Sequence, residues 1–352
     1  MNDFLIEERI STLLSLIDSL QLDILKLEAK TVSKVIEKKI KQKDKIIREY
    51  YKELNTLINS KLYDIDKDLI KVITENAELY LKTDLETYKK AFKKGLIKSQ
   101  PVITKANKVI LAKSIKAGKS IIDNTIKELK INSNNQISNI ITKAIYNTNK
   151  GIPREKNIIQ SATEIFNKSI NIKDNAGREW KDITAYVRMN VKSIGNKTYI
   201  SQQEQLAEDI GIPKKDRKIE VSSHHGSRPE HAVWQGRVYS YKDFVKICKP
   251  NTATGICGIN CRHRYYEFID GISKPVFTHY NEEEDKKRYE IQQKQRYIEA
   301  NIRKYKQQLV ISENMGLDTT KAKNKVSEWQ ERARQHTKEY NTLRRYYREK
   351  IN

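Results

Sequence analysis

The sequence predicts a mainly α protein that carries one small α+β domain. Over long stretches the apolar residues recur at steps of three and four, the spacing of an amphipathic helix. Hydrophobic residues make up 38% of the chain, which suits long amphipathic helices better than one thick core. One window contains all three cysteines and five of the six histidines. We therefore expect four regions: an extended helical region (1–130), a helical part leading into the core domain (131–215), the α+β domain (216–279) and a basic helical hairpin (280–352).

The extended helical region begins with a regular apolar stripe. Its members step by 3, 4, 3, 4 and 3 along the chain: Ile10, Leu13, Ile17, Leu20, Ile24 and Leu27. The stripe has to be buried, because an isolated helix is marginal in water. Two interpretations are open, an intramolecular helical bundle or an arm that docks on another protein. No Gly or Pro interrupts the first 94 residues, so helix is expected over 1–60 and 61–92, with Gly95 as the stop.

The part from 131 to 215 is predicted to be a series of helices separated by breaks. Asn132–Asn135 is interpreted as a break, and 171–177 as a polar loop. Helices are expected over 137–146, 154–169, 180–192 and 201–210, with Gly151–Pro153 and Gly211–Pro213 as stops.

The last two regions differ in their periodicity. Alternating or aromatic-rich runs predict strands at 218–223, 237–241 and 264–269, and three strands packed on helices give a small α+β domain. From residue 281 onward the helical period returns. Two amphipathic helices joined by a polar turn at 312–320 predict an antiparallel hairpin, with the stripe of its second helix reaching Tyr347.

The charge balance favours a polyanionic partner. Lys and Arg number 68 against 45 acidic residues, a net charge of +23. The outside of the hairpin carries the candidate phosphate contacts: Arg332, Arg334, Lys338, Arg344, Arg345, Arg348 and Lys350. Contacts of this kind are independent of nucleic-acid sequence and sensitive to salt.

Several other classes of protein are disfavoured. An odd number of cysteines argues against a disulfide framework. The N-terminus is acidic and lacks the basic and apolar regions of a signal peptide. No apolar run approaches the roughly 20 residues that span a bilayer. We expect a protein without a membrane span that is made in a reducing cytoplasm.

Zinc binding is one interpretation of the thiols and imidazoles in the α+β domain. Cys257, Cys261, His263 and His224 are ligands of the type that zinc selects. Their spacing is looser than that of a zinc knuckle, because the second ligand pair would have to come from the histidine segment upstream. The competing interpretation needs no cofactor: the cysteines are small buried hydrophobes and the histidines bond to backbone at turns.

Enzymatic chemistry is another interpretation of the same window. A metal-dependent nuclease or processing enzyme would be centred on His224, His231, Asn260 and His263. Acidic residues are too sparse there to form a carboxylate cluster for Mg²⁺. A Cys–His hydrolase would need an activated thiol, and nothing marks a helix N-terminus beneath any of the cysteines.

A structural role for these residues has more support in the sequence. Arg228–Pro229 fixes a turn, because proline locks φ and restricts its predecessor. Trp234 supplies the largest apolar area in the window, and Gly236 and Gly258 permit tight bends. Three polar residues can hydrogen-bond backbone groups that the bends leave unpaired: Asn260, Arg262 and His263.

Two segments of this window resemble the phage minor capsid protein 2 family, which is related to the Mu-F-like head morphogenesis proteins. HHGSRPEHAVWQG resembles that family's H-x-G-A-R-P-x-H-x-x-W-Q-G, and GICGINCRHRYYEFIDG contains its G-x-N-C-R-H. The matching residues are His224, Arg228, Pro229, His231, Trp234, Gln235, Gly236, Gly258, Asn260, Cys261, Arg262 and His263. Ser227 stands where alanine is more usual. AGREWKDITAYVRMNV and QRYIEANIRKYKQQL also resemble the family, so the resemblance covers roughly residues 140–350.

The resemblance implies a structural role in the phage head. Proteins of that family are minor capsid proteins near the portal that act in head morphogenesis, and related proteins bind the portal or DNA or leave with the genome on ejection. The implied partners are the phage portal protein, other capsid proteins and packaged double-stranded DNA. The implied location is the capsid interior of the virion, after assembly in the host cytoplasm. The resemblance carries over no catalytic residues, so we expect no enzymatic activity.

Overall fold

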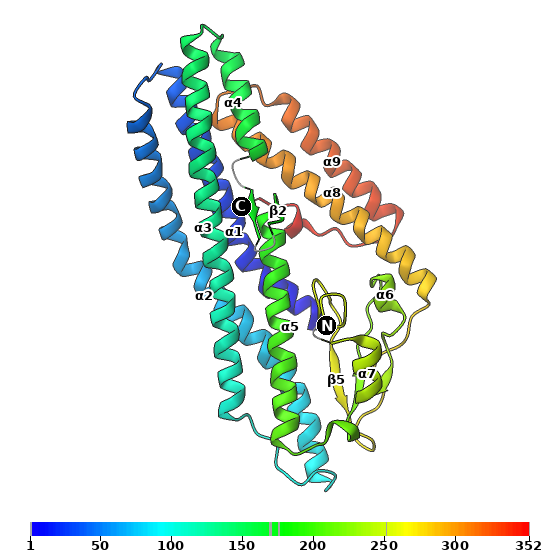
Figure 1. The fold of residues 1–352 in the computed structure, drawn as a ribbon. Helices are drawn as coiled ribbons and strands as arrows, with labels where there is room; N and C mark the ends of the chain where they lie inside the picture. Colours follow the sequence, from blue (N-terminus) through cyan, green and yellow to red (C-terminus); the bar gives the residue numbers. More distant parts are fainter. Residues whose placement is uncertain (1, 169–170, 175–176, 251, 352) are drawn as a thin grey trace. The chain divides into compact units, whose positions relative to one another are not determined.

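The computed structural model describes residues 2–168, 171–174, 177–250 and 252–351. It is mainly α with small antiparallel sheets, which confirms the predicted fold class (Figure 1). The long helices are α1 (Asn2–Glu37), α2 (Lys43–Lys93), α3 (Lys105–Asn149), α4 (Arg154–Lys168), α5 (Ile183–Asp209), α8 (Glu282–Asn314) and α9 (Thr320–Glu339). The short elements are β1 (Ile172–Lys173), β2 (Glu179–Trp180), β3 (Lys218–Val221), α6 (Pro229–Ala232), β4 (Val238–Ser240), α7 (Tyr241–Cys248), β5 (Tyr265–Phe268) and the 3₁₀ turns η1 (Lys214–Asp216) and η2 (Tyr346–Arg348).

Two compact units are assembled from alternating stretches of the chain. The sheet unit comprises Met1–Ile10, Asp68–Ile121 and Arg188–Gln293. The hairpin unit comprises Ser11–Lys67, Ile122–Val187 and Lys294–Asn352. Because the long helices contribute residues to both units, the four consecutive regions expected from the sequence stay a prediction.

The three strands that the sequence predicts are confirmed, and all of them lie in the sheet unit. They form one antiparallel sheet in the order β4-β3-β5, with β3 pairing to both neighbours. In the central strand Ile219 and Val221 are fully buried as expected, but Glu220 between them is buried as well, so the burial does not alternate. Phe244 of α7 packs on Tyr265 of β5 with ring centroids 4.6 Å apart. In the same unit α2 and α5 share an apolar cluster: Leu81, Tyr88, Leu206, Ala207 and Ile210.

The hairpin unit buries most of the stripe predicted in α1. Leu13, Ile17, Leu20 and Ile24 are at most 3% exposed, so the helix buries its apolar face within the chain. This confirms the bundle interpretation and leaves none of these four described side chains for a docking arm. The predicted C-terminal hairpin also forms, with α8 and α9 side by side (Figure 1) and a core of Ile298, Ile302, Trp329 and Ala333.

Uninterrupted helix over residues 1–60 is a wrong prediction. Helix α1 ends at Glu37 and α2 begins at Lys43. Lys39 adopts a left-handed conformation with φ 46°, and the N–H of Ile40 donates to the carbonyl of Val35 at 3.1 Å. This is a Schellman-type ending, which usually has glycine at the left-handed position. A lysine there gives no signal in the sequence.

The predicted break at Asn132–Asn135 is also wrong, because α3 runs through it. Two polar side chains of this stretch, Asn132 and Ser133, bond to partners within the hairpin unit. Ser133 is fully buried, lies 2.5 Å from the Tyr50 hydroxyl and donates to Glu28. Asn and Ser carry only a small intrinsic penalty in a helix, and such tertiary partners offset it.

Two helix ends differ from the predictions. Trp180 belongs to β2 and α5 begins three residues later, at Ile183. Helix α9 ends at Glu339, although the apolar spacing continues to Tyr347. Asn341 is left-handed (φ 47°), and the N–H of Thr342 donates to the carbonyl of Thr337, which again closes a Schellman-type end.

Other predicted helix ends are confirmed. Gly95, Gly151 and Gly211 all have positive φ directly after α2, α3 and α5. Among the described helices, none combines the length and the apolar character that crossing a bilayer requires.

Candidate functional site

The first motif segment forms a turn followed by helix α6. Pro229 takes the first position of α6, and the extended backbone of Arg228 precedes it. The turn is held by Asp285, from the first turn of α8. The backbone N–H groups of Gly226 and Ser227 donate to its two carboxylate oxygens at 2.6 and 3.0 Å, and the Ser227 hydroxyl donates as well. These donors compensate a carboxylate that is only 1% exposed.

Gln235 joins this turn to the histidines. Its Nε2 donates to Asp285 at 3.1 Å, and its Oε1 accepts the backbone N–H of His224 at 2.9 Å. The same Oε1 lies 2.9 Å from Nε2 of His263. Because an amide oxygen only accepts, Nε2 of His263 has to carry the donated proton. The neutral ring therefore keeps its lone pair on Nδ1.

Three side chains converge at the centre of the α+β domain, and we call them the thiol–imidazole cluster: His231, Cys261 and His263. The Cys261 sulfur lies 3.7 Å from Nδ1 of His231 and 3.6 Å from Nδ1 of His263. Nε2 of His231 donates to the Thr254 carbonyl at 2.8 Å, which also leaves its Nδ1 with the lone pair. All three residues are 2–3% exposed.

The cluster shares two residues with the zinc set expected from the sequence. Cys261 and His263 belong to it, but His231 takes the place expected for Cys257 or His224. The Cys257 thiol instead donates to the carbonyl of His263 at 3.3 Å. The His224 ring meets His263 edge-on with centroids 4.9 Å apart, and its Nε2 lies 3.2 Å from the Ser222 hydroxyl.

Trp234 packs over the cluster. Its ring lies 4.6 Å from that of His231 and 4.9 Å from that of His263, measured between centroids. The side chain is 5% exposed. Its carbonyl accepts a hydrogen bond from the Tyr239 hydroxyl at 3.0 Å. Trp234 therefore covers the imidazoles from one side and connects them to strand β4.

The two motif segments are tied together by guanidinium groups. Arg262 donates to the carbonyls of His225 and Gly226 at 3.3 and 3.1 Å. Arg228 donates in the opposite direction, to the Ile259 carbonyl at 2.5 Å. Arginine suits this role because its planar fork reaches several acceptors at once.

Close backbone approaches explain two further motif residues. A Cβ on Gly236 would lie 2.3 Å from the Thr278 carbonyl oxygen, so only glycine fits there. Asn260 is exposed and left-handed (φ 55°), a conformation that asparagine tolerates better than most residues. Its contribution is this backbone turn.

Burial sets the ionisation of the cluster and its surroundings. It lowers the pKa of His231, and with the neighbouring His224 and His231 it holds the pKa of His263 well below its usual range. Burial raises the pKa of the Cys248 and Cys257 thiols to about 12. A thiol nucleophile requires a lowered pKa, so neither cysteine suits a Cys–His hydrolase.

A second buried polar group lies beneath β5 in the sheet unit. Arg217 donates to Glu267 at 2.9 Å and to Glu204 at 2.8 Å. Burial, and then the negative charge of Glu267, raise the pKa of Asp84 to about 8. Oδ2 of Asp84 lies 2.9 Å from the Tyr199 hydroxyl, which also bonds to the Tyr265 carbonyl. Since one hydroxyl has one proton, a protonated Asp84 completes the chain of hydrogen bonds.

Comparison with known proteins decides which family this chain belongs to. Residues 2–338 match the family described as phage minor capsid protein 2. This chain belongs to the phage minor capsid protein 2 family. It is 24% identical over 318 residues to a structural protein of Lactococcus phage LL-H, which covers 82% of this chain and 84% of that protein. It is 38% identical over 103 residues to a structural protein of Lactococcus phage mv4, which covers 28% of this chain and 84% of that protein. No solved structure matches.

The family match confirms the resemblance seen in the two motif segments and extends it. The motif resemblance covers roughly residues 140–350, whereas the match begins at residue 2. The long helices α1, α2 and α3 are therefore part of what this minor capsid protein shares with its family. A virion structural protein is the class that these comparisons support.

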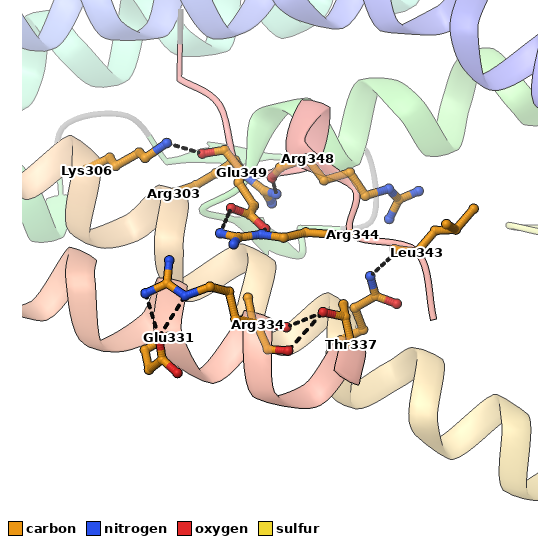
Figure 2. Close-up of polar contacts among 11 residues, drawn as sticks. Arg303, Lys306, Glu331, Arg334, Thr337, Leu343, Arg344, Arg348 and Glu349 are labelled. Atoms are coloured by element: carbon orange, nitrogen blue, oxygen red, sulfur yellow. Dashed lines mark hydrogen bonds and ion pairs between the residues drawn. The ribbon is translucent and has the colours of Figure 1, made fainter. Parts of the chain in front are cut away.

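Four of the arginines expected to contact nucleic acid in this minor capsid protein have carboxylate partners. Arg332 pairs with Glu328 and Arg334 with Glu331, at 2.7 and 2.6 Å. Beyond α9 the chain folds back along α8, and the side chains of this C-terminal tail bond to their own unit (Figure 2). Arg344 binds Glu349 and Arg345 binds Glu299, each through two hydrogen bonds.

The remaining residues of that set differ in their surroundings. The Arg348 carbonyl accepts a hydrogen bond from Arg303 at 2.5 Å, and Lys306 donates to the Glu349 carbonyl at 2.8 Å (Figure 2). Lys338 and Lys350 are exposed on α9 and the tail. Pairing thus neutralises much of the charge that the sequence places on the hairpin.

A different basic stretch of the minor capsid protein lacks acidic residues altogether. Residues 87–122, which we call the lysine segment, contain ten lysines and no Asp, Glu or Arg. They run from the end of α2 through the connecting loop into α3, within or at the edge of the sheet unit. Within the described residues no ion pair involves its exposed members Lys89, Lys90, Lys93, Lys98, Lys105 and Lys108.

The lysine segment and Asp285 are two features that sequence reasoning missed. The lysine segment has a plain signal, a run of 36 residues without an acid. Asp285 has none, because it ends an acidic run, Glu282–Asp285, that resembles ordinary charge at a helix N-terminus.

Proposed function

We propose that this minor capsid protein lies inside the phage head near the portal, acts in head morphogenesis and contacts the packaged double-stranded DNA. Family membership over residues 2–338 supports a place in the virion, and two phage relatives are structural proteins. The net charge of +23 supports a polyanionic neighbour, because lysines that neutralise phosphates release counterions.

The observation that carries the DNA contact is the lysine segment. The segment itself contains no carboxylate side chain. The carboxylate of Asp209, at the end of α5, contacts the segment by accepting a hydrogen bond from the Thr104 hydroxyl at 2.9 Å. Exposed ammonium groups outside ion pairs can bind phosphates without first giving up a carboxylate. We propose that DNA meets this segment and that the paired hairpin arginines contribute less.

The α+β domain, in this proposal, holds shape and does no chemistry. Many of its donors and acceptors bond within the sheet unit, as Gln235, Asp285 and Arg262 illustrate. The raised pKa of the Cys257 thiol argues against a nucleophile there. The positions of the side chains do not support a nuclease centred on His224, His231, Asn260 and His263. Asn260 is exposed, whereas His231 and His263 are buried.

DNA binding is tested with the full chain and a short duplex of mixed sequence. We expect binding at low salt, with an affinity that falls steeply and linearly in log–log form as salt rises. A second duplex of unrelated sequence should bind equally well. Absence of binding at low salt, or an affinity that does not depend on salt, would contradict the DNA contact.

Location is tested by cross-linking mass spectrometry on intact virions. Cross-links from the lysines of this chain to the portal protein and to inner capsid surfaces are expected. Cross-links confined to outer capsid or tail proteins would contradict the proposed position.

A plasmid-nicking assay with added Mg²⁺ or Zn²⁺ is expected to show no cleavage, and cleavage that His231→Ala abolishes would establish the enzymatic alternative.

A further inference from the structure

We propose that the thiol–imidazole cluster is a structural zinc site whose protein ligands are His231, Cys261 and His263. Within the described residues, these side chains form the group of potential ligands whose donor atoms lie within 4.8 Å of one another. A cysteine and two imidazoles are the ligand types that zinc selects over Mg²⁺ or Ca²⁺. The proposal goes beyond the structural role in the phage head and does not depend on it.

The hydrogen bonds around the cluster prepare both imidazoles to be ligands. His231 donates from Nε2 to the Thr254 carbonyl, and His263 donates from Nε2 to the amide oxygen of Gln235. Each neutral ring therefore directs an Nδ1 lone pair at the Cys261 sulfur. One thiol proton can satisfy only one of two lone pairs, whereas a cation satisfies both together with the sulfur. Donation of the second ring nitrogen to a carbonyl or amide is what outer partners of zinc-binding histidines do.

The two sulfur–nitrogen distances fit a tetrahedral ion. With Zn–S bonds of about 2.3 Å and Zn–N bonds of about 2.0–2.1 Å, the tetrahedral angle puts sulfur and nitrogen about 3.5–3.6 Å apart. The two observed separations are 3.7 and 3.6 Å. An ordinary N–H or O–H hydrogen bond would be much shorter. The two sulfur–nitrogen distances therefore suit two ligands of one metal ion as well as they suit a weak thiol hydrogen bond.

The position of the ligands gives the ion a structural task. His231 lies in α6, and Cys261 and His263 lie in the loop that leads into β5. The ion would fasten two segments that are thirty residues apart in sequence, and it closes a loop without a disulfide. The ligands are 2–3% exposed, which suits an ion that holds structure more than one that accepts a substrate. Structural zinc sites usually have four protein ligands, so with three the fourth position is left to a water molecule, and burial of the ligands is what favours a structural ion here.

The test uses the untagged full chain, stripped with a chelator and then loaded with Zn²⁺ or Co²⁺. We expect about one tightly held zinc per chain by elemental analysis. The cobalt form should show the intense visible bands of tetrahedral Co²⁺ and a sulfur-to-cobalt charge-transfer band. Cys261→Ser should lose the charge-transfer band, and His231→Ala should lower the bound zinc at least tenfold.

Two matched cysteine variants serve as controls. Cys248→Ala removes a buried thiol outside the cluster, and Cys257→Ser removes the thiol that bonds to the His263 carbonyl. Both should retain the metal and the charge-transfer band. Loss of metal in Cys257→Ser with normal helical circular dichroism would overturn this ligand set in favour of one that includes Cys257.

The wild-type chain decides the matter even if a variant fails to fold. A folded wild-type protein that takes up less than about one tenth of an equivalent of either metal overturns the proposal. So does a cobalt spectrum without a sulfur band, or a Cys261→Ser protein that binds zinc as the wild type does. DNA binding by the lysine segment is measured separately, so failure here leaves the proposed function standing, and the reverse also holds.

Discussion

Two segments of the sheet unit use their polar side chains in opposite ways. In the α+β domain the thiol–imidazole cluster and Gln235 contact one another, and the buried carboxylate of Asp285 in α8 accepts hydrogen bonds from Gln235 and from two backbone N–H groups. The lysine segment contains no acid, and lysines such as Lys89 and Lys98 are exposed to solvent. The difference shows that residue types rich in chemistry do not by themselves mark an active site. The partners of each group decide whether it maintains the fold or is available to bind another molecule.

The largest expected effect concerns the buried side chains of the α+β domain. Trp234→Ala should lower the free energy of unfolding by about 3–5 kcal/mol, the range for an emptied aromatic site in a core. The reason is that Trp234 packs on His231 and His263 and is nearly inaccessible. Thermal or denaturant unfolding measures the change. A shift near zero, together with weaker DNA binding, would mean that the ring serves recognition.

The next largest effect concerns the exposed lysine segment. Changing Lys89, Lys90, Lys93 and Lys98 to Gln should weaken DNA binding roughly 10- to 100-fold. The salt dependence should become shallower by about one unit of slope for each phosphate that is no longer neutralised. The melting temperature should stay unchanged, because these side chains are exposed and have no ion pairs among the described residues. Fluorescence anisotropy over a salt series measures both affinity and slope.

A variant with the same reduction in charge controls for net charge. Lys38, Lys41, Lys45 and Lys52 are exposed in the hairpin unit and lie close in sequence to Asp44 and Glu49. Their change to Gln should weaken binding much less. Equal effects in the two variants would mean that overall charge, and not the lysine segment, governs the interaction.

The third prediction tests the buried acid beneath the sheet. The pKa of Asp84 is raised to about 8, whereas an aspartate in the unfolded chain titrates near 4. The folded chain therefore retains a proton that the unfolded chain releases, so stability is full below about pH 4 and falls as pH rises to about 8. The slope from this group is at most about 1.4 kcal/mol per pH unit.

Asp84→Asn mimics the protonated form and should remove this part of the pH dependence. Unfolding measured at pH 5 and pH 8.5 should show the variant gaining stability relative to the wild type at the higher pH. Parallel pH profiles for the two proteins would show that Asp84 ionises normally in the folded chain.

The smallest effect is expected at the hairpin. Arg332→Gln and Arg334→Gln should each change DNA affinity less than about twofold, because the guanidinium groups already have Glu partners on the same helix. Stability should change by no more than about 0.5 kcal/mol, as for other exposed pairs three or four residues apart. A tenfold drop in DNA affinity in either variant would place the DNA contact on the hairpin.

Periodicity and turn residues predict much of the fold, and partner-dependent features escape them. The strands around Ile219, Val238 and Tyr265 and the helix stop at Gly95 follow from alternation and from glycine chemistry. The break at Lys39 does not, because a left-handed lysine has no sequence signature. The continuous helix through Ser133 depends on tertiary partners that only the folded chain supplies.

The candidate site divides in the same way. Its location in the His- and Cys-rich window is evident from residue types alone. The membership of the thiol–imidazole cluster is not, because spacing favours Cys257 while the fold brings His231 to Cys261. Charge behaves similarly: the sequence places arginines on the hairpin, and the folded chain pairs Arg344 and Arg345 with glutamates.

Hydrogen–deuterium exchange on the full chain, with and without double-stranded DNA, tests the opposition between the two segments most directly. DNA should slow exchange within residues 87–122 and leave the segments 222–236 and 257–264 unchanged. Protection of those two segments, with none in the lysine segment, would contradict the account and make the histidine-rich domain the DNA-binding surface.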